Sequence, residues 1–261
     1  FVKTDLTSIG CDVGLKRLQR IKMKKWIVFI ASLFASSAFA ATDAQIIDHF
    51  KASIQVPNIS ITVDGRQNVE GIAGMDFVTL TLSDGTRSQK LSIFTKDELI
   101  FPDVISIKQG GSIKEMMEMA ELQKKMSVLY KKEEKKNIVS LGNDPKKETL
   151  VVFTDPECPY CRQELAQIEE RLKTNNLKLI FTPVHERSSL EKSILIYNET
   201  AKAKSDADKI AILKKYYDEN VKYTQKISDA EVQRIEDLKL KYFGAGIKGV
   251  PFMVREKELL K

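Results

Sequence analysis

Residues 150–161 read LVVFTDPECPYC. The first four of these residues form a continuous apolar run, which is typical of a strand buried on both faces of a sheet. Cys158 and Cys161 follow, and after them comes a segment with apolar residues at helical spacing. A second apolar run covers residues 177–184. Strand, cysteines, helix and strand in this order predict a βαβ unit with parallel strands.

The position of the cysteines at a helix start predicts thiol chemistry. Unpaired N–H groups and the helix dipole favour an anion there, so a thiolate at Cys158 is stabilised. Cys161 lies about one turn inside the helix, close enough to attack a mixed disulfide on Cys158. Pro159 suits the first helical turn, and Tyr160, between the cysteines, is a candidate for substrate contact. We predict a redox-active pair with Cys158 as nucleophile and Cys161 as resolving thiol, and no cofactor.

Three other uses of the cysteines are possible. A zinc site needs about four ligands, and beyond the cysteines the chain offers only His49 and His185, which fall in different predicted domains. A purely structural disulfide in so short a loop would join no distant parts of the fold. Haem attachment would require a histidine where Arg162 stands. A redox dithiol without a metal is therefore favoured.

The first 40 residues account for the basic charge of the chain. The formal net charge is +6, but residues 1–40 hold seven Lys and Arg against two Asp, which leaves +1 for the rest. A basic start at Met23, an apolar stretch and an A-F-A motif at 38–40 predict a cleavable signal peptide over 23–40. We interpret 1–22 as non-native upstream translation. Export suits disulfide chemistry, and the neutral remainder argues against a nucleic-acid partner.

Three segments follow the predicted signal peptide. Residues 41–110 predict a small α+β unit, with a helix from Thr42, strands at 59–63, 77–82 and 91–94, and turns at Asp64-Gly65 and Asp84-Gly85. So small a unit has a marginal core, so we expect it to pair with a second copy. Residues 111–136 predict a linker helix with a capping box of Ser112 and Glu115. Residues 137–261 form the predicted catalytic domain, with a long helical stretch at 190–243 and a last strand at 250–254.

Residues 152–161 resemble the active-site segment of the DsbC/DsbG disulfide isomerases of the bacterial periplasm. Val250 and Pro251 after a glycine resemble the loop that carries the cis-proline of thioredoxin folds. The order of the segments is also similar to that family. The resemblance implies a thioredoxin-like α/β domain with a helical insertion, preceded by a small α+β (cystatin-like) dimerisation domain and a linker helix.

The resemblance also implies partners and a substrate site. The chain would be a periplasmic homodimer that acts as a protein disulfide isomerase on secreted proteins with cysteines, and a membrane redox partner would recycle the dithiol. Pro251, if cis, would lie against Cys158. Val250 and Pro251 would then bind a substrate strand together with Pro159 and Tyr160.

Several departures from the family keep alternatives open. Val250 stands where the isomerases usually carry Thr, and it matches the DsbA oxidases, so a dimeric oxidase that donates disulfides is the first alternative. A periplasmic holdase chaperone is the second. Only residues 252–261 follow Pro251, so the C-terminus is either naturally short or cut. Strand positions Val151 and Val152 offer no buried carboxylate, and Asp155 and Glu157 are interpreted as loop residues.

Overall fold

The computed structural model describes residues 40–54 and 56–261. The predicted upstream stretch and, except for Ala40, the predicted signal peptide lie outside the described residues. No helix in the described part has both the length and the apolar character needed to cross a bilayer.

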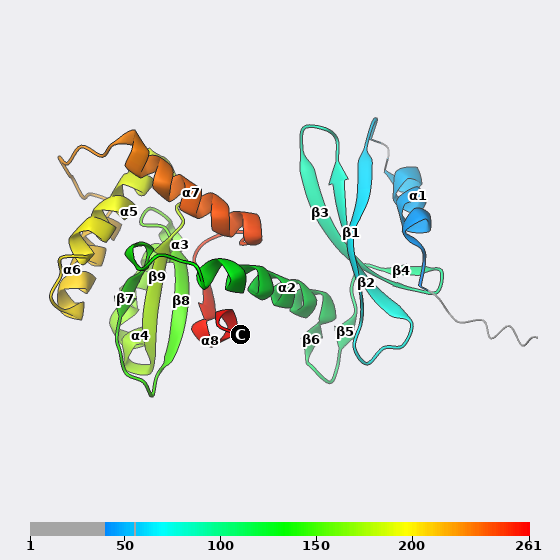
Figure 1. Cartoon of the computed structure of the whole chain (residues 1–261), viewed down its shortest axis with the longest axis horizontal. Coiled ribbons are helices and arrows are strands. Elements are labelled where there is room, and N and C mark those ends of the chain that lie inside the picture. Colours follow the sequence, from blue (N-terminus) through cyan, green and yellow to red (C-terminus); the bar gives the residue numbers. More distant parts are fainter. Residues whose placement is uncertain (1–39, 55) are drawn as a thin grey trace, which may run out of the picture. The chain divides into compact units, whose positions relative to one another are not determined.

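The N-terminal part is an α+β unit, as predicted. Thr42 caps its helix with a complete capping box, and the helix places the buried Ile46 against the sheet. The sheet has four antiparallel strands in the order β1-β2-β3-β4, and a short hairpin, β5–β6, follows it (Figure 1). The elements are α1 (Asp43–Ser53), β1 (Ser60–Asn68), β2 (Met75–Ser83), β3 (Ser88–Lys96), β4 (Leu99–Phe101), β5 (Ile105–Ser106) and β6 (Gly111–Ser112).

The turn predicted at Asp64-Gly65 is wrong, because β1 runs straight through these residues. The register of β1 against β2 shifts between Val63 and Gly65, which makes the site a β-bulge. Asp64 is held there by hydroxyl groups, accepting from Thr62 at 3.3 Å and from Thr81 at 2.5 Å. The turn predicted at Asp84-Gly85 is confirmed between β2 and β3.

The linker helix α2 (Ile113–Tyr130) begins as predicted but ends six residues before Lys136. Ser112 accepts from the Glu115 backbone N–H at 3.0 Å, but the Glu115 side chain does not return the bond, so only half of the predicted capping box forms. After the helix ends, the Glu133 carboxylate accepts from Asn137 at 2.8 Å and from Tyr242 at 2.7 Å. A short 3₁₀ turn, η1 (Lys135–Asn137), follows.

The C-terminal part is built on a four-stranded sheet in the order β10-β8-β9-β7. Strands β8 and β9 are parallel and the other pairs antiparallel, so the predicted βαβ unit is confirmed. Two helices, rather than the expected one, connect these strands, because the chain leaves helical geometry at Gln167. The elements are β7 (Val139–Leu141), β8 (Glu148–Thr154), α3 (Pro159–Ala166), α4 (Ile168–Thr174), β9 (Asn175–Phe181) and β10 (Phe252–Arg255).

The long helical stretch predicted at 190–243 is divided into three helices. Ser205 and Ser228 each start a new helix with a complete capping box, with Asp208 and Glu231 as the reciprocal partners. The three helices, yellow to orange in Figure 1, form the insertion between β9 and β10. Their bounds are α5 (Arg187–Thr200), α6 (Asp206–Tyr217) and α7 (Asp229–Ala245), and a short α8 (Glu256–Leu259) follows β10.

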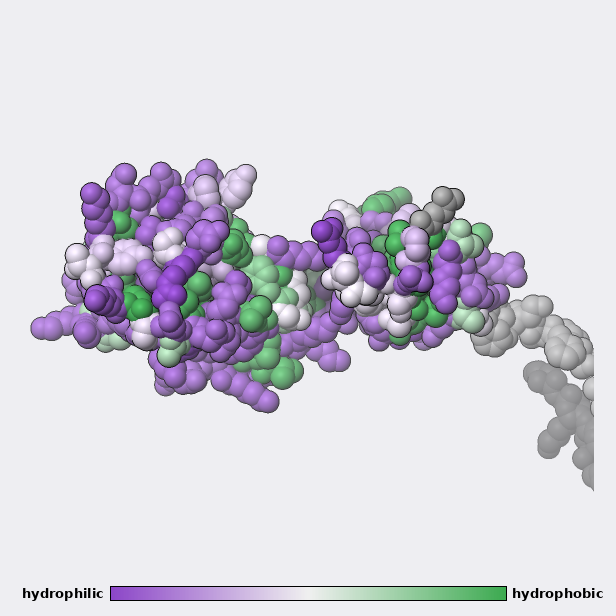
Figure 2. Space-filling view, turned by 90° about the horizontal axis from the view of Figure 1, so that it is seen from above, coloured by the Kyte–Doolittle hydropathy of each residue, from purple (hydrophilic) through white to green (hydrophobic). Residues whose placement is uncertain are grey.

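Strand β8 is buried on both faces, as its apolar run predicts. Val151 and Phe153 belong to the core shared with α2, α7 and α8, and the Phe153 ring lies 4.6 Å from that of Tyr242. Val152 belongs to the opposite core, with residues of α3 to α6. Polar residues (purple) cover most of the visible outer surface of this domain in Figure 2. Because both faces of β8 are packed up to its end, the cysteines follow a firmly held strand.

Candidate active site at the end of strand β8

The cysteines lie where β8 gives way to α3. Cys158 is the N-cap residue of α3 and Pro159 is its first helical residue, as the sequence predicts. Both cysteines are free thiols, and they are 5% and 1% exposed respectively. Tyr160 is 69% exposed, and Pro159 is exposed as well. Cys158 therefore lies beside the unpaired N–H groups at the start of α3, and Cys161 is buried inside the helix.

The fold brings Cys158 together with Val250, 92 residues away in the chain. The Cys158 thiol donates to the Val250 carbonyl oxygen at 3.6 Å. The Val250–Pro251 peptide is cis, in agreement with the resemblance. The fold thus places a backbone carbonyl group next to the Cys158 thiol.

Asp155 is the buried residue on which the active-site loop is built. Its carboxylate, 0% exposed, accepts from three backbone N–H groups: Glu157 at 2.8 Å, Val184 at 2.8 Å and His185 at 3.2 Å. It also accepts from the Ser189 hydroxyl, and His185 Nδ1 lies 2.7 Å from it. Burial opposes its ionisation, but these hydrogen bonds outweigh burial and lower the pKa of Asp155.

This role was not visible in the sequence, which gives Asp155 only as a loop residue. Its partners come from the segment after β9 and from the start of α5, about 30 residues further along the chain. His185 does not stand alone on the surface, because its ring is bound to this carboxylate. The Asp155 carboxylate joins two loops. None of its hydrogen bonds within the described residues is to a cysteine sulfur, as a proton shuttle would require.

Glu157, next to the nucleophile, is also paired. Its carboxylate accepts from the Lys192 ammonium at 2.9 Å and from the Ser188 hydroxyl at 2.9 Å. The Lys192 side chain is only 6% exposed. Because the lysine neutralises it, Glu157 places little net negative charge beside a Cys158 thiolate.

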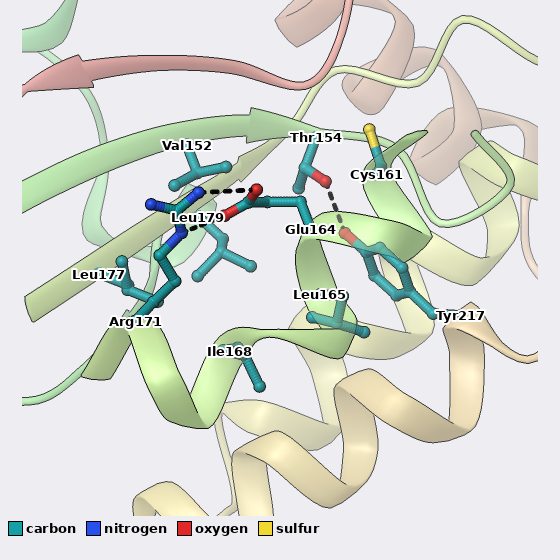
Figure 3. Close-up of a pocket in the computed structure, with 10 residues that line it drawn as sticks. All are labelled: Val152, Thr154, Cys161, Glu164, Leu165, Ile168, Arg171, Leu177, Leu179 and Tyr217. Atoms are coloured by element: carbon teal, nitrogen blue, oxygen red, sulfur yellow. Dashed lines mark hydrogen bonds and ion pairs between the residues drawn. The ribbon is translucent and has the colours of Figure 1, made fainter. Parts of the chain in front are cut away.

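Cys161 lines a small pocket beside the start of α3, and Figure 3 shows the residues around it. Burial raises the pKa of its thiol to about 12, against the opposing effect of hydrogen bonds from Thr154 and the Asp155 backbone. The pocket is lined by both apolar and polar groups. Among the polar ones, Glu164 and Arg171 form an ion pair with bonds of 2.6 and 3.0 Å.

Replacing Asp155 with Asn should destabilise the fold, because an amide NH₂ would face donors that now meet a carboxylate oxygen. We expect a loss of about 1–3 kcal/mol at neutral pH. The folded-state pKa of Asp155 is lowered, so its contribution is present above the unfolded pKa and is lost as pH falls through the folded value. The difference between the variant and the original protein should therefore shrink below about pH 4.

Urea unfolding of both proteins at neutral and acidic pH measures this difference. Asp237→Asn is the matched control, because Asp237 is an exposed helix residue that accepts one side-chain bond, from Gln233. It should change stability by less than about 0.5 kcal/mol. An Asp155→Asn protein as stable as the original would show that the carboxylate does not hold the loops together.

The chain was compared with known proteins at three levels. No family model matches it, and no curated sequence matches it. Among solved structures, DsbG from Helicobacter pylori is 19% identical with a TM-score of 0.50, over 81% of this chain and 99% of that one. The thiol-disulfide exchange protein α-DsbA2 from Wolbachia pipientis is 14% identical with a TM-score of 0.40, over 54% and 87%. A linker-deletion variant of ScsC from Proteus mirabilis is 22% identical with a TM-score of 0.34, over 55% and 76%.

The likeness to H. pylori DsbG is the informative one, because it spans almost all of that chain. At 19% identity it speaks for the fold alone. The predicted thioredoxin-like α/β fold with a helical insertion is thereby confirmed. This chain therefore has the thioredoxin-type fold of H. pylori DsbG.

Proposed function

We propose that this protein is an exported thiol–disulfide oxidoreductase of the DsbC/DsbG type, which isomerises or reduces incorrect disulfides in secreted proteins. One observation carries the proposal: a free dithiol at the start of α3 lies against the carbonyl that precedes a cis-proline. This arrangement supplies a nucleophile, a resolving thiol and a backbone acceptor for a peptide. The fold shared with DsbG from H. pylori supports it.

The chemistry begins at Cys158. Its thiolate, favoured by the start of α3, attacks a substrate disulfide and forms a mixed disulfide as one substrate thiolate leaves. Either the freed substrate thiol then attacks another disulfide of the same molecule, or Cys161 attacks Cys158 and releases the substrate reduced. The first route is isomerisation and the second is reduction.

Substrate binding is assigned to four residues around the dithiol. Tyr160 is exposed and offers an aromatic surface, and Pro159 lies beside it at the helix start. Val250 and Pro251 would present backbone groups to an extended substrate segment. Because these contacts are mainly to the substrate backbone, they suit an enzyme that accepts many proteins.

We further propose that the α+β unit before α2 joins two protomers. Three strongly exposed apolar side chains follow β3 in the chain: Leu99 at 59%, Ile105 at 67% and Ile107 at 97%. Contact with a second copy would remove such side chains from water. We also propose the division into a dimerisation domain at 41–110, a linker at 111–136 and a catalytic domain at 137–261, and export to the periplasm after cleavage near Ala40.

An oxidase remains the second candidate, and Val250 is the observation that favours it. The carbonyl oxygen of Val250, the residue before the cis-proline, lies 3.6 Å from the Cys158 sulfur. Val in this position matches the oxidases. In that case the protein would donate its own disulfide to substrates.

Replacing Cys158 with Ser should reduce thiol–disulfide exchange to the uncatalysed rate, because a serine hydroxyl is not ionised at neutral pH. Replacing Cys161 with Ser should instead trap mixed disulfides on Cys158. Non-reducing gels of cells that express each variant, followed by mass spectrometry of the trapped partners, measure both effects. A fully active Cys158→Ser protein would end the proposal.

Light scattering of the protein from Ala41 onward should give twice the mass of one chain. Ile107→Glu should shift it toward the monomer, because a charge would enter the proposed apolar contact. Leu240→Glu, on the exposed face of α7, is the matched control and should remain dimeric. A monomeric original protein would contradict the proposed dimer and would not bear on the proposed thiol–disulfide exchange.

The redox state of the dithiol in cells separates isomerase from oxidase. We expect Cys158 and Cys161 to be mostly reduced, because a dithiol must carry a free thiolate to attack an incorrect disulfide. Acid quenching and alkylation with a mass-shifting reagent measure the reduced fraction. A mostly oxidised pair would favour the oxidase.

A further inference from the structure

Two buried hydroxyl groups lie in a row beside the resolving cysteine. Thr154, the last residue of β8, and Tyr217, the last residue of α6, have their oxygen atoms 2.7 Å apart. Thr154 is 3% exposed, Tyr217 is 4% exposed and Cys161 is 1% exposed. All three line the same small pocket, and Figure 3 shows the bond between the two hydroxyl oxygens with Cys161 next to Thr154.

The two hydroxyls can align toward the sulfur. Burial raises the pKa of Tyr217 well above its ordinary value, so the phenol keeps its proton and can donate it to Thr154. When Tyr217 donates, the Thr154 proton is free to point at Cys161. A hydrogen bond from Thr154 favours the charged form of that sulfur. The geometry thus provides a pair of bonded hydroxyls in the pocket that Cys161 also lines.

We propose that Tyr217 is a positioning residue for the resolution step, which orients the Thr154 hydroxyl to donate to the Cys161 thiolate. The inference rests on the proposed function, since resolution belongs to that chemistry. Because Tyr217 belongs to α6, the helical insertion would then contribute a side chain to the resolution step.

The step balances without an added reactant. The mixed disulfide joins Cys158 to a substrate sulfur, and Cys161 begins as a thiol. As Cys161 loses its proton, its sulfur forms a bond to the Cys158 sulfur, and the bond from Cys158 to the substrate breaks. The substrate sulfur leaves with the electron pair and ends as a thiol carrying a proton. The dithiol is oxidised and the substrate is reduced.

Other groups near Cys161 are less suited to this task. Glu164 lines the same pocket, but both of its oxygens accept from Arg171. Asp155 is saturated by donors from the loop after β9 and the start of α5. The strand residues Val151 and Val152 carry no polar group. The two hydroxyls are therefore the donors best placed to stabilise a charge on Cys161.

Tyr217→Phe tests the inference, because it removes the hydroxyl and keeps the ring that packs near Phe181. Reduced protein is mixed with oxidised glutathione, and the glutathione adduct on Cys158 is followed by acid quench and mass spectrometry. Formation of the adduct should change little. Its resolution should slow by about tenfold at neutral pH, which corresponds to a pKa of Cys161 higher by about one unit. The rising limb of the pH–rate profile should move up by the same amount.

Tyr216→Phe is the matched control. Tyr216 is a buried neighbour on the same helix, but its hydroxyl is bound to Glu199, and the variant should resolve at the original rate. Thr154→Val should slow resolution at least as much as Tyr217→Phe, and Thr154→Ser should restore it. In the Thr154→Val background, Tyr217→Phe should have no further effect, because the phenol acts through the threonine.

The outcomes separate this inference from the proposed function. If the original protein forms no adduct on Cys158, the proposed function fails. If the adduct forms and Tyr217→Phe resolves it at the original rate and with the original pH profile, the inference on Tyr217 is wrong. If Tyr217→Phe does not fold, the Thr154 pair decides: equal resolution rates in Thr154→Val and Thr154→Ser would overturn the donor chain.

Discussion

Strand β8 is buried on both faces, and the elements that carry and surround the cysteines are arranged around it. Val151 and Phe153 point into one core and Val152 into the other, so the end of the strand lies deep in the protein. Its last polar groups, Thr154 and Asp155, cannot reach water and must find partners inside. Those partners come from the insertion and from the loop before it, which fixes these elements around the cysteines.

The sequence predicted what depends on local pattern. The apolar run of β8, the helix start at Cys158 and the parallel strand β9 all have signals within a few residues. The division of the insertion into α5, α6 and α7 also had a local signal, since Ser205 and Ser228 each stand three residues before an acidic residue. Continuous apolar spacing across these caps masked the breaks. At Asp64-Gly65 the same dipeptide that makes a turn elsewhere makes a bulge, because strand pairing continues on both sides.

The polar contacts of the site could not be predicted in this way. Tyr217 sits on an apolar stripe of its helix, and nothing near it in the chain shows that its hydroxyl meets Thr154, 63 residues earlier. Asp155 looks like a loop residue for the same reason, because its donors lie about 30 residues away. Side chains that satisfy one another across the fold are chosen by the three-dimensional arrangement, and a single sequence contains no periodicity that reports them.

The distribution of charge around the dithiol suggests how the two cysteines are kept different. The carboxylates nearest to Cys158 are compensated, Asp155 by hydrogen bonds and Glu157 by Lys192, so neither opposes a thiolate at the start of α3. Cys161 has no helix terminus to stabilise it, and burial raises its pKa. Under the proposed function, Cys161 would therefore rest as a thiol and carry a charge only when it attacks. Neutral hydroxyls suit that need, because they can donate to a transient charge without favouring it permanently, whereas a buried cation would hold Cys161 ionised and let it compete with Cys158 for substrate.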